Sequence, residues 1–337
     1  MKDSAVLLID CPDQKGLVAR VSSLLYERGA NILHADQHQD HELGLFFMRV
    51  EWALNGLAEG SPGSADGSPS AAGAAETHSK TPLHAVPPPS AVLPPSAMLP
   101  PSAVPPTSAG PFDLEGFKAA FAPLAAELGM RWKLSSTERL PRVALFCSQY
   151  LHCMADLLYR WRTGELSCEI PVIVSNHREV EKLAGFYGIP FEFVEVTAAE
   201  RGEAEARQLK LLESLGVELV VLARYMQVLT PGFVARYPAA IINVHHSFLP
   251  AFTGAKPYHA AHARGVKLIG ATSHYVTDVL DDGPIIEQDV ARISHRDQVE
   301  DLVARGRDLE RIVLSRAVRW HLDRRILCYG NKTVVFG

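Results

Sequence analysis

Apolar runs alternate with segments of helical periodicity from Arg142 onwards, and this alternation limits the possible folds more than any other feature of the chain. The runs RVALFCS, EIPVIVSN and VELVVLARYM are rich in apolar residues, and helical segments such as HCMADLLYRWRTG separate them. Strands that are buried on both faces and separated by helices are typical of a parallel, doubly wound α/β sheet. Ligands bind such sheets at the carboxyl ends of the strands, which is where ARYMQVL and NVHH fall.

A different order of elements is expected before the alternating region. The run AVLLID predicts a strand, and an apolar stripe from Leu17 to Leu25 predicts a helix that ends at Gly29. Two strands follow, NILHADQHQD and LGLFFMRVEW, whereas the next helix and strand, DLEGFKAAFAPLAAELG and MRWKLSS, come only after residue 111. Together these elements have the order βαββαβ, which resembles the ACT regulatory domain, a small ferredoxin-like module.

Residues 55–111 separate the two parts of this unit and are rich in Ala, Pro, Ser and Gly. PPSAVL, PPSAML and PPSAVP repeat within them with a six-residue period. Such a segment buries too little apolar surface to offset its chain entropy, so we expect a disordered insertion within the ACT-like unit. An interdomain linker is one alternative. A PxxP ligand is another, but no basic residue accompanies the repeats. The expected domains are residues 1–137, ACT-like, and residues 141–337, catalytic.

Composition excludes several classes of protein. The net charge of −5 gives no broad positive field, so no nucleic-acid partner is expected. No apolar run approaches the ~20 residues of a membrane span, and the start, MKDSAVLLIDCPD, lacks the features of a signal peptide. The five cysteines are scattered without a CxxC pair, which favours neither disulfides nor a zinc site. A cytoplasmic protein without a membrane partner is expected.

Three polar residues suggest the chemistry. Asn243 and His245 stand two apart at the end of the apolar run AAIINV, so on a strand their side chains share one face. Asp281 lies in the turn-like VLDDGP, between two runs that predict strands. An amide, an imidazole and a carboxylate suffice for acyl transfer without a covalent intermediate. Two of them stabilise an oxyanion and one handles the proton of the nucleophile. His246 points to the opposite face and is expected only to pack.

The same stretch resembles the formyltransferase family that handles 10-formyltetrahydrofolate, whose signature is Asn-x-His, then Ser-x-Leu-Pro, then a distant Asp-x-Gly. The matching residues are Asn243, His245, Ser247, Leu249, Pro250, Asp281 and Gly283. HHSFLPAF, GAKPYH and DDGPII are similar to the deformylase branch of this family. The resemblance implies a hydrolase that converts 10-formyltetrahydrofolate to formate and tetrahydrofolate by attack of water on the N10-formyl group. It implies a role in one-carbon and purine metabolism, with the folate as substrate and without a metal or other cofactor.

The resemblance also implies a folate site built on two segments beside the catalytic residues Asn243, His245 and Asp281. His274, in the strand before Asp281, is expected to support them from the second shell. The expected substrate-binding residues are Tyr225, Met226, Gln227, Val228 and Leu229, together with Val276, Thr277, Asp278, Val279 and Leu280.

Two other functions and a metal site are less favoured. A transferase with a phosphate-bearing amine acceptor needs a glycine-rich turn after the first strand, whereas this chain has CSQYLHCMADLL, in which Gln149, Tyr150 and Leu151 are bulky. A non-catalytic folate and amino-acid sensor is the other alternative, and the intact Asn-His-Asp set argues against it. His259 and His262 have helical i,i+3 spacing suited to a metal, but no carboxylate or cysteine completes a site.

ACT domains generally bind small amino acids in the loop before the first helix, at an interface between paired modules. Here the resemblance implies an effector such as glycine or methionine near Asp10, Asp13, Gly16 and Asn31. Gly16 would allow close approach of a carboxylate to the helix N-terminus. Ordinary capping by Asp13 is the alternative explanation of this turn. Pairing of such modules implies a homo-oligomer.

Overall fold

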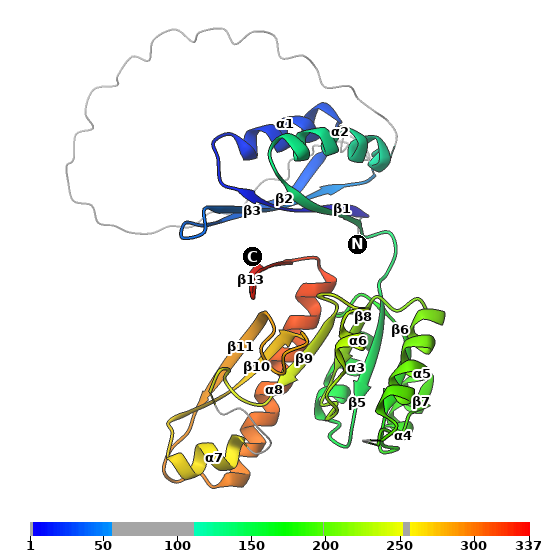
Figure 1. Cartoon of the computed structure of the whole chain (residues 1–337), viewed down its shortest axis with the longest axis vertical. Helices are drawn as coiled ribbons and strands as arrows, with labels where there is room; N and C mark the ends of the chain where they lie inside the picture. The colour runs from blue at the N-terminus through cyan, green and yellow to red at the C-terminus, as the bar shows by residue number, and fades with distance from the viewer. Residues whose placement is uncertain (1–2, 56–110, 198, 252–256) are drawn as a thin grey trace, which may run out of the picture.

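The computed structural model describes residues 3–55, 111–197, 199–251 and 257–337 (Figure 1). The first sheet has four antiparallel strands in the order β2-β3-β1-β4. Its elements follow the expected βαββαβ order: β1 (Ser4–Pro12), α1 (Leu17–Glu27), β2 (Asn31–Asp40), β3 (Leu45–Ala53), α2 (Leu114–Glu127) and β4 (Arg131–Ser136). The prediction of an ACT-like unit is therefore confirmed.

Helices α1 and α2 cover one face of this sheet (Figure 1). The predicted stripe of α1 is buried at Leu17, Val21 and Leu25, and the chain leaves the helix through Gly29, which has the left-handed φ of 75°. Helix α2 begins at a capping residue, Asp113, whose side chain accepts a hydrogen bond of 2.9 Å from the backbone N–H of Gly116. The two helices form one apolar core with the sheet.

The C-terminal hairpin covers the other face of the first sheet, which the sequence did not predict. Its strands are β12 (Ile326–Tyr329) and β13 (Lys332–Val335), with the turn at Gly330 and Asn331. Phe336 and Tyr329 pack there against Phe47 of β3, and the rings of Phe47 and Tyr329 are 4.5 Å apart. The end of the chain thus ties the catalytic half to the ACT-like half (Figure 1).

The second sheet has seven strands in the order β11-β10-β9-β8-β5-β6-β7. Strands β5 to β9 are parallel, and β10 and β11 are antiparallel additions at one edge. The elements are β5 (Arg142–Cys147), α3 (His152–Arg162), β6 (Glu169–Ser175), α4 (Glu181–Tyr187), β7 (Phe191–Phe193), α5 (Arg201–Ser214), β8 (Leu219–Leu222), α6 (Pro231–Val234), β9 (Ile241–His245), α7 (Pro257–Arg264), β10 (Leu268–Tyr275), β11 (Ile285–Arg292) and α8 (Val299–Leu322). Helices α3, α4 and α8 pack on one face, and α5 and α6 on the other. This is the expected doubly wound, mostly parallel arrangement.

One strand is shorter than expected. The strand expected over residues 217–226 ends at Leu222, because the chain turns away at Arg224, which has a φ of 64°. Helix α8 begins at Val299, with a capping box between Gln298 and Asp301. The short α6 was not predicted, although Thr230 caps it. In the described part of the chain, no helix is long and apolar enough to cross a membrane.

The two ends of the insertion meet. Phe112 donates a backbone hydrogen bond of 2.8 Å to the carbonyl of Leu54, directly after β3 and before α2. The expectation of a disordered insertion concerns residues 55–111, and of these 56–110 lie outside the described residues. The boundaries of the insertion, and the division of the chain at residues 137–141, remain proposals.

We predict that replacing residues 56–110 by a short Gly/Ser turn leaves the thermal midpoint nearly unchanged, because Leu54 and Phe112 are already in contact. Thermal unfolding of the two proteins measures this. A fall of more than about 5 °C, roughly 1 kcal/mol for a domain the size of the ACT-like unit, would contradict the prediction.

Candidate active site

Strand β9 ends with Asn243 and His245, next to the antiparallel β10. In the register of these strands, His274 lies opposite Asn243. The loop from β10 to β11 then folds back and brings Asp281 to both histidines. The carboxylate oxygen Oδ2 of Asp281 is 3.1 Å from Nδ1 of His245, and Oδ1 is 3.7 Å from Nε2 of His274. The structure therefore brings together the three predicted catalytic residues and the predicted second-shell histidine.

Two unusual backbone positions shape the loop that carries Asp281. Asp281 itself has a φ of 55°, a conformation that Asp tolerates better than most residues. Gly283 passes so close to β10 that a Cβ there would overlap the carbonyl oxygen of Tyr275. The Asp-x-Gly pattern thus has a local cause, since the glycine lets the loop return against the strand.

Charge in the site is concentrated on Asp281, whose side chain is 17% exposed. Hydrogen bonding to His245, and secondarily to His274, holds the pKa of Asp281 well below its usual range, against the opposite effect of burial. Asp281 is therefore an anion at neutral pH. The other ring nitrogen of His245, Nε2, is buried without a hydrogen-bond partner among the described residues. An unpaired buried nitrogen is costly, and this one is available to a substrate.

His274 orients the amide of Asn243. The ring nitrogen Nδ1 of His274 is 2.9 Å from the carbonyl oxygen of Tyr275, which can only accept, so Nδ1 carries a proton. Nε2 of the same ring lies 3.3 Å from the amide nitrogen of Asn243 and 3.7 Å from Oδ1 of Asp281. The amide has a second N–H, which remains free to donate to a substrate oxygen.

The turn after His245 is held by side chains of the neighbouring strands. Thr272 donates to the carbonyl of Ser247 at 2.9 Å and accepts from the N–H of Leu249 at 3.1 Å. Gln288 donates to the carbonyl of Leu249 at 3.1 Å. These hydrogen bonds therefore fix the position of the matching Ser-x-Leu-Pro segment next to His245. Residues 252–256, which follow it, lie outside the described residues.

The two segments expected to bind folate present apolar side chains to solvent. Met226, Val228, Val279 and Leu280 are exposed. Thr277 and Asp278 lie in the second of these segments, in the turn before Asp281. Tyr225 differs, because its ring is buried in the core and its hydroxyl accepts a hydrogen bond of 3.0 Å from Gln208. Gln227, Leu229 and Val276 are half-buried. Contact of these residues with folate remains a prediction.

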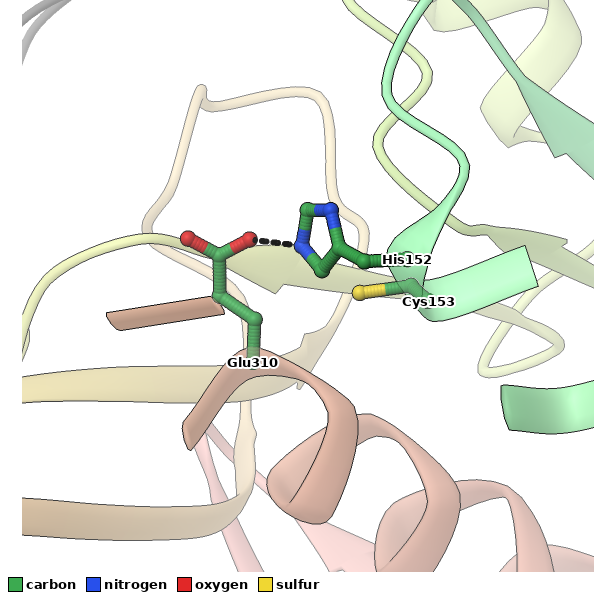
Figure 2. A group of neighbouring side chains, drawn as sticks. All are labelled: His152, Cys153 and Glu310. Atoms are coloured by element: carbon green, nitrogen blue, oxygen red, sulfur yellow. Dashed lines mark hydrogen bonds and ion pairs between the residues drawn. The ribbon is translucent and has the colours of Figure 1, made fainter. Parts of the chain in front are cut away.

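A buried ionic cluster beside the site was not predicted. Glu310 of α8 accepts hydrogen bonds from His152 of α3 at 2.7 Å and from the Tyr258 hydroxyl of α7 at 2.8 Å. Nε of Arg224 lies 3.5 Å from the same carboxylate. Figure 2 shows His152 and Glu310 pointing toward each other, with Cys153 alongside. No local pattern in the sequence could have found this cluster, since its members come from four separate elements.

The donor atoms of His152, Cys153 and Glu310 lie within 4.8 Å of one another, as a metal site would require (Figure 2). Their chemistry does not fit a cation. Both oxygens of Glu310 are already engaged, and the positive charge of Arg224 lies beside them. Burial raises the pKa of the Cys153 thiol well above its usual value, so the thiolate that binds metals is disfavoured. His259 and His262 of α7 belong to no metal-capable group among the described residues.

The predicted effector residues are only partly together. Asp13 and Gly16 line a cavity of about 840 Å³ between the β1–α1 loop and β2. Asp10 faces elsewhere, because its carboxylate accepts from Nε of Arg131 at 2.7 Å and lines the groove between the two halves of the chain. Asn31 is exposed at the start of β2, away from this cavity. The other polar residues that line this cavity are Gln14, Lys15, Gln37, His38, Gln39 and His41.

Comparisons with known proteins agree with this architecture. The formyl transferase family matches residues 141–318, and the ACT domain family matches residues 5–51. The chain is 44% identical to a formyltetrahydrofolate deformylase of Synechocystis sp., over 99% of this chain and 98% of the relative. It is also 44% identical to that of Bacillus subtilis, over 99% of this chain and 94% of the relative. The crystal structure of a formyltetrahydrofolate deformylase from Pseudomonas syringae pv. tomato superimposes with a TM-score of 0.81 at 40% identity, covering 100% of this chain and 95% of the other.

We predict that Gly283→Ala lowers catalytic turnover by about 100-fold while the chain still folds, because the new methyl group pushes the loop and displaces Asp281 from His245. Gly202→Ala is the matched control, since a Cβ at this exposed position in α5 meets no other atom. Turnover and thermal unfolding of both variants test this. Unchanged turnover of Gly283→Ala would show that the close approach to Tyr275 does not position Asp281.

Proposed function

We propose that this chain, which belongs to the formyltetrahydrofolate deformylase family, hydrolyses 10-formyltetrahydrofolate to formate and tetrahydrofolate by direct attack of water. The observation that carries the mechanism is the His245–Asp281 pair, in which Nδ1 is bound to a carboxylate and Nε2 is buried with no partner in the described part of the chain. A protonated His245 presents Nε2–H as a donor in a site of low dielectric, where such a donor acts strongly on a developing negative charge.

In the proposed reaction, a water oxygen bonds to the formyl carbon, and the formyl oxygen becomes an oxyanion. The Asn243 amide and His245 donate hydrogen bonds to this oxyanion. Asp281 holds the charge on His245, orients the water and accepts its proton. The bond between the formyl carbon and N10 then breaks, N10 takes up the proton from Asp281, and formic acid leaves and ionises in water to formate and a proton. Water supplies one oxygen of the formate and the formyl group supplies the other.

The turn after β5 supports water rather than an amine as the nucleophile. Tyr150 stands between two guanidinium groups, with its ring centre 5.4 Å from Arg224 and 5.9 Å from Arg307. The hydroxyl of Ser148 donates to Asn176 at 2.7 Å and accepts from the N–H of Met226 at 3.0 Å. The Ser148 hydroxyl is thus engaged within the chain, and residues 147–158 contain none of the glycines with which a turn cradles the phosphate of an acceptor.

The catalytic assignment predicts that Asp281→Asn lowers kcat by at least about 100-fold while folding is retained, because the proton acceptor is lost and Asn tolerates the left-handed backbone. Asn243→Ala and His245→Ala each remove a donor to the oxyanion, so we expect kcat to fall by a similar factor. The neighbouring Asp282 is exposed, and the ion pairs with His245 and His274 are made by Asp281, so Asp282→Asn is the matched control. Formate release from 10-formyltetrahydrofolate is the measurement.

Near-normal release by any triad variant would remove that residue from the mechanism. The same assay is run with EDTA, because we propose that no metal takes part. A loss of activity that zinc restores would contradict this part of the proposal and assign a metal to the enzyme.

We further propose that the cavity at Asp13 and Gly16 binds a small amino acid, with glycine and methionine as candidates. Gly16 has a φ of 90° and precedes α1, whose first N–H groups favour a carboxylate. Strand β2 lies at the edge of its sheet, and its residues are almost all exposed, Ile32 and Leu33 among them. Such an edge supports pairing with a second copy of the chain in a homo-oligomer.

The effector proposal predicts that glycine or methionine at millimolar concentration raises the thermal midpoint and changes the rate of formate release. Asp13→Asn should weaken both effects, because Asp13 lines the cavity, whereas Glu42→Gln in the next turn should not. If neither amino acid alters the midpoint or the rate, the ACT-like unit is only an assembly module.

A further inference from the structure

We infer that Glu310 and Arg224 are positioning residues that hold His246 as a neutral imidazole, with its proton on Nε2, directly against the catalytic His245. This inference rests on the proposed function, because it assigns the pair a task in charging His245. His246 was expected only to pack, and the structure gives it a polar partner instead.

The anchor of this arrangement is Glu310, which is 1% exposed in the middle of α8. Burial would raise the pKa of Glu310, but the hydrogen bond from His152 and the charge of Arg224 outweigh it and lower the pKa below its usual value. Tyr258 reaches the carboxylate across Gly306, where a Cβ would overlap its ring. Glu310 is therefore a fixed anion whose charge Arg224 balances.

Arg224, which is held by Glu310, also contacts His246. Its guanidinium nitrogen Nη1 lies 2.6 Å from Nδ1 of His246. A guanidinium can only donate, so Nδ1 must be the acceptor and the ring proton must be on Nε2. Burial, then the charge of Arg224, then His245, lower the pKa of His246 to about 4. The ring thus stays neutral throughout the range in which histidine ordinarily titrates.

The neutrality of His246 matters because its ring stacks on His245. The two ring centres are 5.1 Å apart and the planes are inclined by 22°. A positive charge on His246 would oppose the charge that His245 needs for the oxyanion. With His246 neutral, an uncharged ring contacts one member of each of two ion pairs, Arg224 of the pair with Glu310 and His245 of the pair with Asp281. The groups that face His246 are Arg224, His245, Tyr258, Asp281 and Glu310.

The first test is nitrogen NMR of the wild-type enzyme labelled in its histidines, with His246→Gln used to assign the signals. We expect His246 to show the neutral Nε2–H form at every pH from 5.5 to 8. A neutral Nδ1–H form, or proton uptake by His246 near pH 6.5, would overturn the inference. This readout does not depend on catalysis, so it stands apart from any failure of the proposed hydrolysis.

The second test removes the charges of Arg224 and Glu310. Arg224→Met/Glu310→Gln eliminates both charges together, which avoids leaving one buried and unpaired. The pKa of His246 should then rise, because the lowering by Arg224 outweighs the raising by Glu310, although burial, the largest cause, still holds it below its ordinary value. Below this new pKa, kcat should fall by up to about tenfold per pH unit, with KM changed by less than about twofold. Adding His246→Gln should abolish this new acid limb, because glutamine does not titrate.

Arg307→Met is the matched control, since Arg307 is exposed and shares the contact with Tyr150 but does not reach His246. It should keep the wild-type pH profile. An acid limb that persists after His246→Gln is added, or a variant without the pair in which His246 takes up no proton, would contradict the assignment. If the variant without the pair does not fold, the tautomer measured in the wild-type enzyme decides the question alone.

Discussion

The contact between His245 and Asp281 is the interaction on which the rest of the structure depends. It joins the last residue of a parallel strand to a loop that follows an antiparallel one, at a nitrogen–oxygen distance of 3.1 Å. Because the residues around it are mostly buried, water screens this ion pair poorly. The attraction between the two charges is therefore stronger than it would be in water. Two neighbouring residues fix the positions of these partners. Gly283 lets the Asp281 loop close against β10, and His246 supports the ring of His245.

Direct packing and hydrogen bonds connect the two halves of the chain. The hairpin β12–β13 packs on the ACT-like sheet, and Arg49 of β3 donates to the carbonyls of Asp323 and Arg324 at 3.2 and 3.1 Å. Tyr275 lies at the groove between the halves, and its hydroxyl is 2.7 Å from Nδ1 of His321. Its carbonyl is the acceptor for His274. One residue therefore touches both the groove and the site.

Sequence patterns predict those parts of the enzyme that have local causes. Asn243 and His245 share a strand face because they stand two apart, and the order of strands and helices follows from apolar periodicity. The Glu310 cluster has no such signal, since His152 and Glu310 are separated by 158 positions and meet only through the packing of α3 on α8. The early end of β8 also escaped prediction, because Arg is not a residue expected in the left-handed region. The proximity of Asn243 and His245 is thus predictable from the sequence, whereas the buried charges of the Glu310 cluster are not.

Hydrolysis of 10-formyltetrahydrofolate in ¹⁸O-labelled water tests the central claim most directly. The account predicts that formate and tetrahydrofolate appear in equal amounts without any amine acceptor, and that each formate carries at least one ¹⁸O atom. Unlabelled formate would indicate a different nucleophile. A strict requirement for an added amine would show that the chain transfers the formyl group instead of hydrolysing it, and would contradict the account.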